Sequence, residues 1–133
     1  MKTLRVLTIT LAAFIPATAH AACTQADLAG SWQAYAMSAS NSGAALTRCK
    51  MTVNASGTIA PTSMCTDHAN NTAPMQAASV KLTTAATCTF NGQFKLGNVL
   101  YRILHGTVAS DKKTASGMGT FPGGGFMFTL TEL

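Results

Sequence analysis

The feature that most constrains the fold of this chain is a succession of short, strand-like runs that begins at residue 30. Each run is rich in Val, Ile, Phe, Tyr and Thr, and each is bounded by Gly, Asn, Asp or Pro. In the run 31–37, Trp32 and Ala34 alternate with Gln33 and Tyr35, so that the two pairs face opposite sides. This two-residue period predicts strands that bury one face.

Helical periodicity is limited to residues 25–29, where Thr24 is placed to cap one short turn. Asn91-Gly92 is a strong signal for a tight hairpin turn. The strand-like runs are 31–37, 47–53, 58–64, 80–84 with 86–90, 93–96, 98–109, 114–121 and 126–133. Turns are expected at 54–57, 91–92, 110–113 and 122–125, and polar loops at 38–45 and 66–75.

About eight strands joined by hairpins predict an all-β fold, either an antiparallel up-and-down barrel or a two-sheet β-sandwich. The barrel is favoured because the chain ends within its last strand, which can pair with the first and remove both open edges. Gly106, Gly117 and Gly119 also lie within strand-like runs, where small barrels bend tightly. The length of 133 residues allows one domain.

The first 21 residues are organised like a secretory signal peptide. Lys2 and Arg5 precede an apolar run at 6–15, and Ala19-His20-Ala21 offers small residues at the two positions that signal peptidase reads. The apolar run is shorter than the roughly 20 residues of a membrane-spanning helix, so no transmembrane segment is expected. Cleavage after Ala21 predicts a secreted or periplasmic protein.

The mature protein is then a single disulfide-stapled β domain at residues 22–133. Lipidation of Cys23 is an alternative to soluble export, although His20 stands where a lipobox has an aliphatic residue. Loss of the two basic residues of the leader lowers the net charge from +5 to +3. The remaining basic residues are dispersed and lack interleaved aromatic residues, so no nucleic-acid partner is expected.

Export gives the four cysteines a structural interpretation. An even number of cysteines in an oxidising compartment favours two disulfides. Of the three possible connectivities, we favour Cys49–Cys65, because these residues flank a hairpin-like stretch at 50–64. Cys23–Cys88 would then tether the N-terminus. A metal site is not expected, because the chain has no C-x-x-C pair and its cysteine spacings match no zinc-finger pattern.

The sequence offers few groups for catalysis, and we expect neither an enzyme nor a cofactor. The chain has no G-x-S-x-G motif, and Asp67-His68 is interpreted as part of a solvated loop. Its methionines form no M-x-M cluster that would indicate copper, so they are interpreted as core residues. Beyond the leader, the carboxylates are Asp27, Asp67, Asp111 and Glu132.

The segment from Asp27 to Trp32, Asp-Leu-Ala-Gly-Ser-Trp, resembles the opening of calycin-type barrels. Lipocalins, avidins and the small periplasmic inhibitors of bacterial metalloproteases share this start. The resemblance implies a barrel whose closed end is plugged by Trp32, and in the inhibitors a cysteine follows in the next strand, as Cys49 does here. The chain differs from the inhibitors in having four cysteines and from avidins in having one tryptophan.

The leading functional hypothesis is an exported binding protein without catalysis, in particular an inhibitor of a protease or another protein of the envelope or extracellular space. Contacts with that protein partner are expected from 22–28, 38–45 or 66–74.

The alternative hypotheses are a carrier of a small apolar molecule inside the barrel and a purely structural envelope protein. His105 lies either inside the barrel or on its solvent-facing side. The candidate ligand-binding residues are Trp32, Phe90, Tyr101, Phe128 and His105, with Phe94, Phe121 and Phe126 as further aromatic residues of the same interior.

Overall fold

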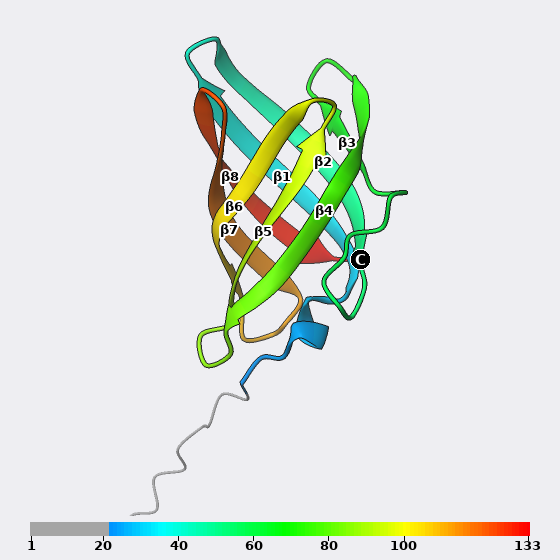
Figure 1. Cartoon of the computed structure of the whole chain (residues 1–133), viewed down its shortest axis with the longest axis vertical. Coiled ribbons are helices and arrows are strands. Elements are labelled where there is room, and N and C mark those ends of the chain that lie inside the picture. Colours follow the sequence, from blue (N-terminus) through cyan, green and yellow to red (C-terminus); the bar gives the residue numbers. More distant parts are fainter. Residues whose placement is uncertain (1–21) are drawn as a thin grey trace, which may run out of the picture.

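The computed structural model describes residues 22–133, which form a closed barrel of eight antiparallel strands in up-and-down order (Figure 1). The 3-10 turn η1 (Gln25–Leu28) precedes the first strand. The strands are β1 (Gly30–Ser40), β2 (Gly43–Val53), β3 (Met64–Asp67), β4 (Thr72–Thr84), β5 (Thr89–Leu96), β6 (Val99–Val108), β7 (Thr114–Phe121) and β8 (Gly124–Glu132).

The last strand pairs with the first, with Trp32 opposite Glu132, so the sheet has no open edge. The barrel prediction is therefore confirmed, and the alternative of a two-sheet sandwich is wrong. The predicted signal peptide, residues 1–21, lies outside the described residues. In the part of the chain that the structure covers, no helix is long and apolar enough to span a bilayer.

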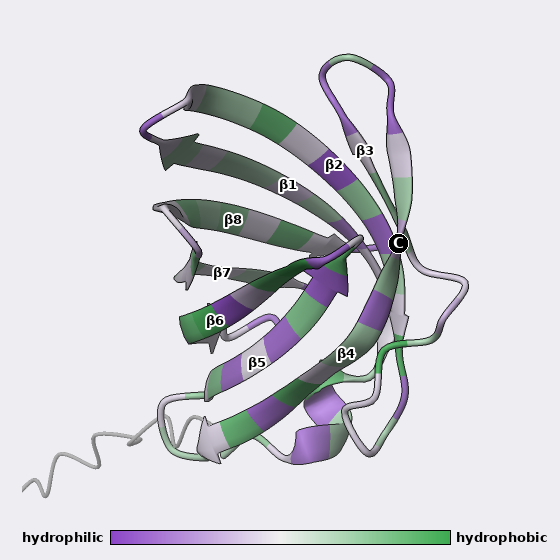
Figure 2. Ribbon diagram, turned by 45° about the horizontal axis from the view of Figure 1, so that its top comes forward, coloured by the Kyte–Doolittle hydropathy of each residue, from purple (hydrophilic) through white to green (hydrophobic). Residues whose placement is uncertain are grey.

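The two ends of the barrel differ. Tight turns at 41–42, 68–71, 97–98 and 122–123 join successive strands at one end, called here the open end. The longer connection 54–63 and η1 cover the other end, the closed end (Figure 1). Along β4 and β5, hydrophobic and hydrophilic residues alternate, as expected for a wall with one side buried (Figure 2).

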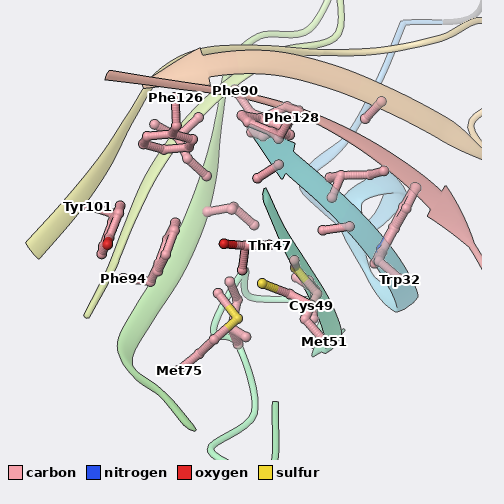
Figure 3. A pocket seen from close by; sticks show the side chains of 18 of the residues that line it. Trp32, Thr47, Cys49, Met51, Met75, Phe90, Phe94, Tyr101, Phe126 and Phe128 are labelled. Atoms are coloured by element: carbon pink, nitrogen blue, oxygen red, sulfur yellow. The ribbon is translucent and has the colours of Figure 1, made fainter. Parts of the chain in front are cut away.

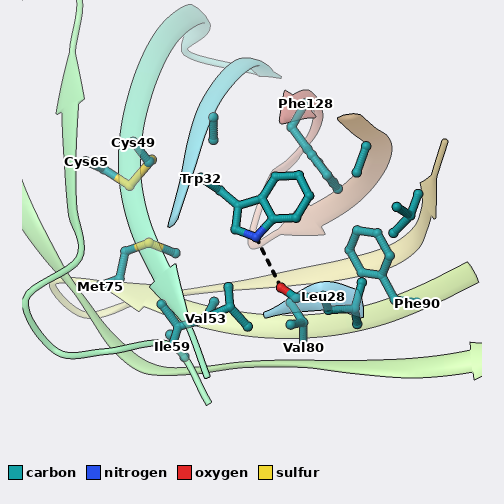
Figure 4. Packing of buried hydrophobic residues seen from close by; sticks show 14 of the residues in the cluster. Leu28, Trp32, Cys49, Val53, Ile59, Cys65, Met75, Val80, Phe90 and Phe128 are labelled. Atoms are coloured by element: carbon teal, nitrogen blue, oxygen red, sulfur yellow. Dashed lines mark hydrogen bonds between the residues drawn. A yellow bond between two sulfur atoms is a disulfide. The ribbon is translucent and has the colours of Figure 1, made fainter. Parts of the chain in front are cut away.

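Trp32 occupies the closed end and is 2% exposed. Its Nε1–H donates a hydrogen bond to the carbonyl oxygen of Leu28, 3.1 Å away, which satisfies the indole in an apolar environment (Figure 4). Val53, Ile59 and Val80 belong to the same buried cluster. The closed end of the barrel is therefore a packed core.

Two disulfides fasten the fold, and they have the pairing favoured from the sequence. Cys23–Cys88 joins the start of the described chain to the β4–β5 turn, and Cys49–Cys65 joins directly opposed residues of β2 and β3. Because cytosolic reductants keep thiols reduced, two disulfides indicate an oxidising, extracytoplasmic compartment.

Several predicted connections are wrong because the strands are longer than the sequence runs indicate. Asn91-Gly92 makes no hairpin: both residues lie within β5, and the turn follows at Gly97-Asn98. The polar loop expected at 38–45 is a hairpin with its turn at 41–42, since small residues such as Ala and Ser extend β1 and β2.

The loop expected at 66–75 is mostly a second hairpin. Asp67 Oδ1 accepts hydrogen bonds from the backbone N–H groups of Ala69 and Asn71, so one side chain closes the turn. The strand expected at 58–64 is instead largely irregular, with single bridges from Thr58 and Ile59 before β3 begins.

The interpretation of the methionines as core residues holds for Met75, which is 3% exposed, and is wrong for Met64, which is 38% exposed, and for the more exposed Met37, Met118 and Met127. Met37, Met118 and Met127 occupy outward positions of β1, β7 and β8 and are more than half exposed. The reason is that successive side chains of a strand point to opposite faces of the sheet, so a residue next to an inward one such as Ala36 points outward.

Candidate ligand-binding site

An apolar cavity of about 90 Å³ lies inside the barrel above the closed end (Figure 3). Its two walls differ in the size of their side chains. Aromatic residues of β5 and β6 form one wall, and small residues of β1 and β2 form the other, while Phe126 and Phe128 of β8 lie beside β1, with which β8 pairs. The walls of β1 and β5 lie on opposite sides of the closed sheet because three strands separate them in either direction around the barrel. The cavity is the space that the small wall leaves unfilled.

The aromatic wall is a cluster of rings in mutual contact. Phe94 and Tyr101 are directly opposed on β5 and β6, and their rings stack with centroids 5.0 Å apart. Phe126 meets Tyr101 edge-on at 5.8 Å, and Phe121 lies 5.2 Å from Tyr101 on the other side. Such ring pairs are worth about 0.5–1.5 kcal/mol beyond area burial, so they hold the wall in place. Phe94, Tyr101 and Phe121 are only half-buried, which leaves apolar surface facing the open end.

The opposite wall consists of small side chains. Ala34, Ala36 and Ser38 of β1 point inward in succession, and Thr47 of β2 is opposite Ala36. The sequence contains this signal, since the alternation that places Trp32 inside places the two alanines inside with it. Sequence reasoning did not identify Ser38 or Thr47 as site residues.

Among residues 22–133, few polar groups line the cavity, and none of them is a carboxylate or a histidine. Within the same residues, side-chain oxygens reach it only from Ser38, Thr47 and Tyr101. Burial raises the pKa of the Tyr101 hydroxyl, so this group stays protonated and is a neutral donor. Within residues 22–133, the hydroxyls of Thr47 and Tyr101 make no hydrogen bond to protein, which leaves both available to a ligand.

Four of the five predicted ligand-binding residues line this cavity. Trp32, Phe90 and Phe128 lie toward the closed end, with the rings of Phe90 and Phe128 6.3 Å apart, and Tyr101 lies toward the open end. His105 is not with them. It is exposed on the outer wall and lines a separate groove there.

The position of His105 follows from a break in the strand alternation. Ile103 pairs with Gly119 and His105 pairs with Met118, so Leu104 is an extra residue in β6 opposite β7. This bulge puts both Leu104 and His105 on the outside, while Gly106 faces inward. Of the two positions considered for His105, the structure has the solvent-facing one.

The remaining ionisable groups lie outside the cavity, with Asp67 and Asp111 at turns and most of the basic side chains on strands. Hydrogen bonds from Asn71 hold the pKa of Asp67 below its ordinary value, and the backbone N–H of Lys113 does the same for Asp111. Between residues 22 and 133, no three His, Cys, Asp or Glu side chains are grouped as metal ligands would be. Asp67 and Asp111 therefore stabilise turns.

Together these features define a small, disulfide-bonded β-barrel with one closed end and an apolar cavity that faces the open end. Comparison of the chain with protein-family models, with curated proteins and with solved structures found no match. The cavity geometry therefore carries the functional argument.

Proposed function

We propose that this protein is an exported, noncatalytic binding protein that takes a small apolar molecule, or the apolar end of a larger one, into the open end of its barrel. The observation that carries the proposal is the asymmetric cavity. Half-buried aromatic rings around Tyr101 face the small side chains of Ala36 and Thr47 across unfilled space. Apolar surface that is half-exposed in the free protein gains free energy when a ligand covers it.

The cavity volume limits the ligand. Drug-sized ligands occupy pockets of about 300 Å³ or more, whereas an apolar cavity of about 150 Å³ holds benzene. A space of about 90 Å³ is smaller than that, so it suits a short alkyl group or part of one ring, with the rest of the ligand projecting from the open end. The hydroxyls of Thr47 and Tyr101 favour a ligand with a single hydrogen-bonding group.

Two further features support an exported carrier. The leader-like residues 1–21 and the two disulfides are both typical of secreted or periplasmic proteins. The resemblance of Asp27 to Trp32 to the start of calycin-type barrels supports the barrel fold of this proposal, and it adds nothing about the ligand.

Trp32 provides the test, because it is the only tryptophan and lines the cavity. Titration with toluene, and with p-cresol as its hydroxyl-bearing counterpart, should give a saturable change in Trp32 fluorescence. Ala36→Leu fills the space opposite the rings and should abolish the change. Ala39→Leu is the control, because Ala39 lies on the same strand but faces outward.

Circular dichroism and thermal unfolding establish that both variants fold. A fluorescence response that persists in Ala36→Leu, or is missing with both probes in the unmodified protein, contradicts a ligand site in the barrel.

Binding of a protein partner, including protease inhibition, is the second candidate. The exposed turns 41–42 and 68–71 at the open end favour it, because they present the polar side chains of Asn41, Ser42, Asn70 and Asn71 to solvent. The segment 22–28 is a weaker contact surface, because Cys23 is disulfide-bonded and Gln25 accepts a hydrogen bond from the Leu82 backbone N–H. Assays against secreted metalloproteases, with the 41–42 turn lengthened by two glycines as the variant, test this candidate.

A further inference from the structure

Three exposed methionines lie side by side on the outer wall of the barrel. Met127 of β8 is directly opposite Met118 of β7 on one side and Met37 of β1 on the other. These three residues are called here the methionine row. Met118 is 54% exposed, Met127 is 56% exposed and Met37 is 51% exposed. His105 of β6 is opposite Met118 and continues the row by one strand.

This arrangement differs from the usual place of methionine, which is among the residue types most often buried. Half of the six methionines in residues 22–133 are in one cross-strand row on the solvent side. All three, with His105, line a single groove of the outer wall. The methionine row therefore does not fill the core. Because its three residues share one exposed place on the barrel, we infer that they have a role other than packing.

The geometry allows the three sulfur atoms to meet. Directly opposed residues on antiparallel strands have Cβ atoms about 4.5–5.5 Å apart, so Met127 has a methionine neighbour at that spacing on each side. Methionine is unbranched and has three rotatable bonds, so Met37 and Met118 can turn their thioethers toward Met127. One ion above Met127 would then be within reach of all three.

Thioether sulfur is a soft ligand that selects Cu(I), whereas oxygen-rich sites select Mg²⁺ and Ca²⁺. The methionine row contains no carboxylate, and imidazole nitrogen from His105 is also a good copper ligand. All four cysteines are in disulfides, so no thiolate of this chain competes for the ion. Arg48 and Asp67, which line the same groove, have opposite charges and leave it without an excess of either sign.

We propose that Met37, Met118 and Met127, assisted by His105, form a surface binding site for Cu(I). The site is separate from the proposed cavity, because the row and the cavity are on opposite sides of the barrel wall. It requires no change in the oxidation state of the ion and no other group than these four side chains.

The first test is titration of the disulfide-bonded protein with Cu(I) under anaerobic conditions, in competition with bicinchoninate, and with Ag(I) as a redox-stable probe. We expect one ion per chain by native mass spectrometry. In a sample with labelled methionine methyl groups, the resonances of Met37, Met118 and Met127 should shift, and that of the buried Met75 should not.

The matched variants are Met127→Leu and Met64→Leu. Both replace a solvent-accessible methionine with an apolar residue of similar size, but Met64 lies on β3 outside the row. Outer-shell partners of metals are already worth about 10- to 100-fold in affinity, so loss of the central ligand should weaken Cu(I) binding by at least about tenfold. Met64→Leu should leave the affinity unchanged, and His105→Ala should lower it.

Each alternative result overturns the site. Equal affinity in Met127→Leu and Met64→Leu shows that the ion does not use the row, and absence of a bound ion at micromolar protein excludes it. Met127→Leu keeps this face apolar but removes the central sulfur. If the variant binds no ion and the protein still self-associates, the methionine row is a docking surface for a second copy and not a metal site.

Discussion

The ring of Phe90 lies against Gly106, its partner on the neighbouring strand β6, so closely that a Cβ atom at residue 106 would overlap the ring carbons. Gly117 and Gly119 of β7 have the same relationship to Phe128 and Phe126 of β8. In each pair the glycine provides the space that its aromatic neighbour fills. The strand glycines thus let large rings pack inside a narrow barrel.

We expect Gly106→Ala to destabilise the fold by about 1–3 kcal/mol, the usual range for an overpacked core. The physical reason is that a Cβ at residue 106 would overlap a ring carbon of Phe90, which is 2% exposed, so the ring must shift from its packed position. Urea denaturation measures the change. Gly125→Ala is the control, because a Cβ there has one ordinary contact, 3.4 Å from the Gly119 carbonyl oxygen. A loss as large in Gly125→Ala would mean that glycine itself, and not the ring, is responsible.

The closed barrel was predictable because the alternation of large apolar and polar residues is local and survives in the sequence. The run 114–121 coincides with β7, and the final run pairs with the first strand as expected. The absence of a turn at Asn91-Gly92 could not be predicted in the same way. The Asn-Gly pair favours a turn locally, but the alternation along the whole of β5 determines the conformation there. Phe90, Gly92 and Phe94 must face inward together, and only a continuous β5 allows this.

Side chains that meet across strands were harder to predict. Met37 is far from Met118 and Met127 in the sequence, and only the register of β7, β8 and β1 makes them neighbours. The outward position of His105 results from the bulge at Leu104, which no pattern in the sequence predicts. To predict the cavity, one has to know that Ala36 faces Tyr101 across the interior. The two residues face each other only because the sheet closes into a barrel.

Removal of either disulfide should destabilise the fold, by an amount that depends on the loop it closes. Cys49–Cys65 spans 16 residues and Cys23–Cys88 spans 65. Restriction of the unfolded chain then predicts losses of about 3 kcal/mol for Cys49→Ala with Cys65→Ala and about 4 kcal/mol for Cys23→Ala with Cys88→Ala. Urea denaturation of the two double variants gives both values. Unchanged stability in either variant would be inconsistent with a structural role for that bridge.

Acid should weaken the attachment of η1 to the barrel. The backbone N–H of Thr24 donates to Asp27 Oδ2 at 2.7 Å, and Lys112 Nζ lies 3.0 Å from Asp27 Oδ1. These contacts, chiefly the first, lower the pKa of Asp27 below its ordinary 3.8. The stability they provide is therefore complete above pH 3.8 and is lost as the pH falls through the lower pKa of the folded state.

Lys112→Gln should move the pKa of Asp27 back toward its ordinary value, as measured by NMR titration of the carboxyl carbon. Lys113→Gln removes the same charge from the next residue, which makes no ion pair with Asp27, and should leave that pKa nearly unchanged. The accompanying stability change should be small, because the pair is partly exposed and screened by salt. Equal shifts in the two variants would point to net charge instead of the ion pair.

Hydrogen peroxide should oxidise the methionines in the order of their exposure. Met37, Met118 and Met127 are open to solvent, whereas Met75 is enclosed by the core and is reached only when the barrel opens. Peptide mapping by mass spectrometry should find sulfoxide at the three outer positions first, with little change in the unfolding temperature, since a polar sulfoxide there stays in water. Oxidation of Met75 at a comparable rate would show that the closed end opens readily. Because sulfoxide formation consumes the thioether sulfur, Cu(I) or Ag(I) bound to the methionine row should slow oxidation at those three residues and leave Met64 unprotected.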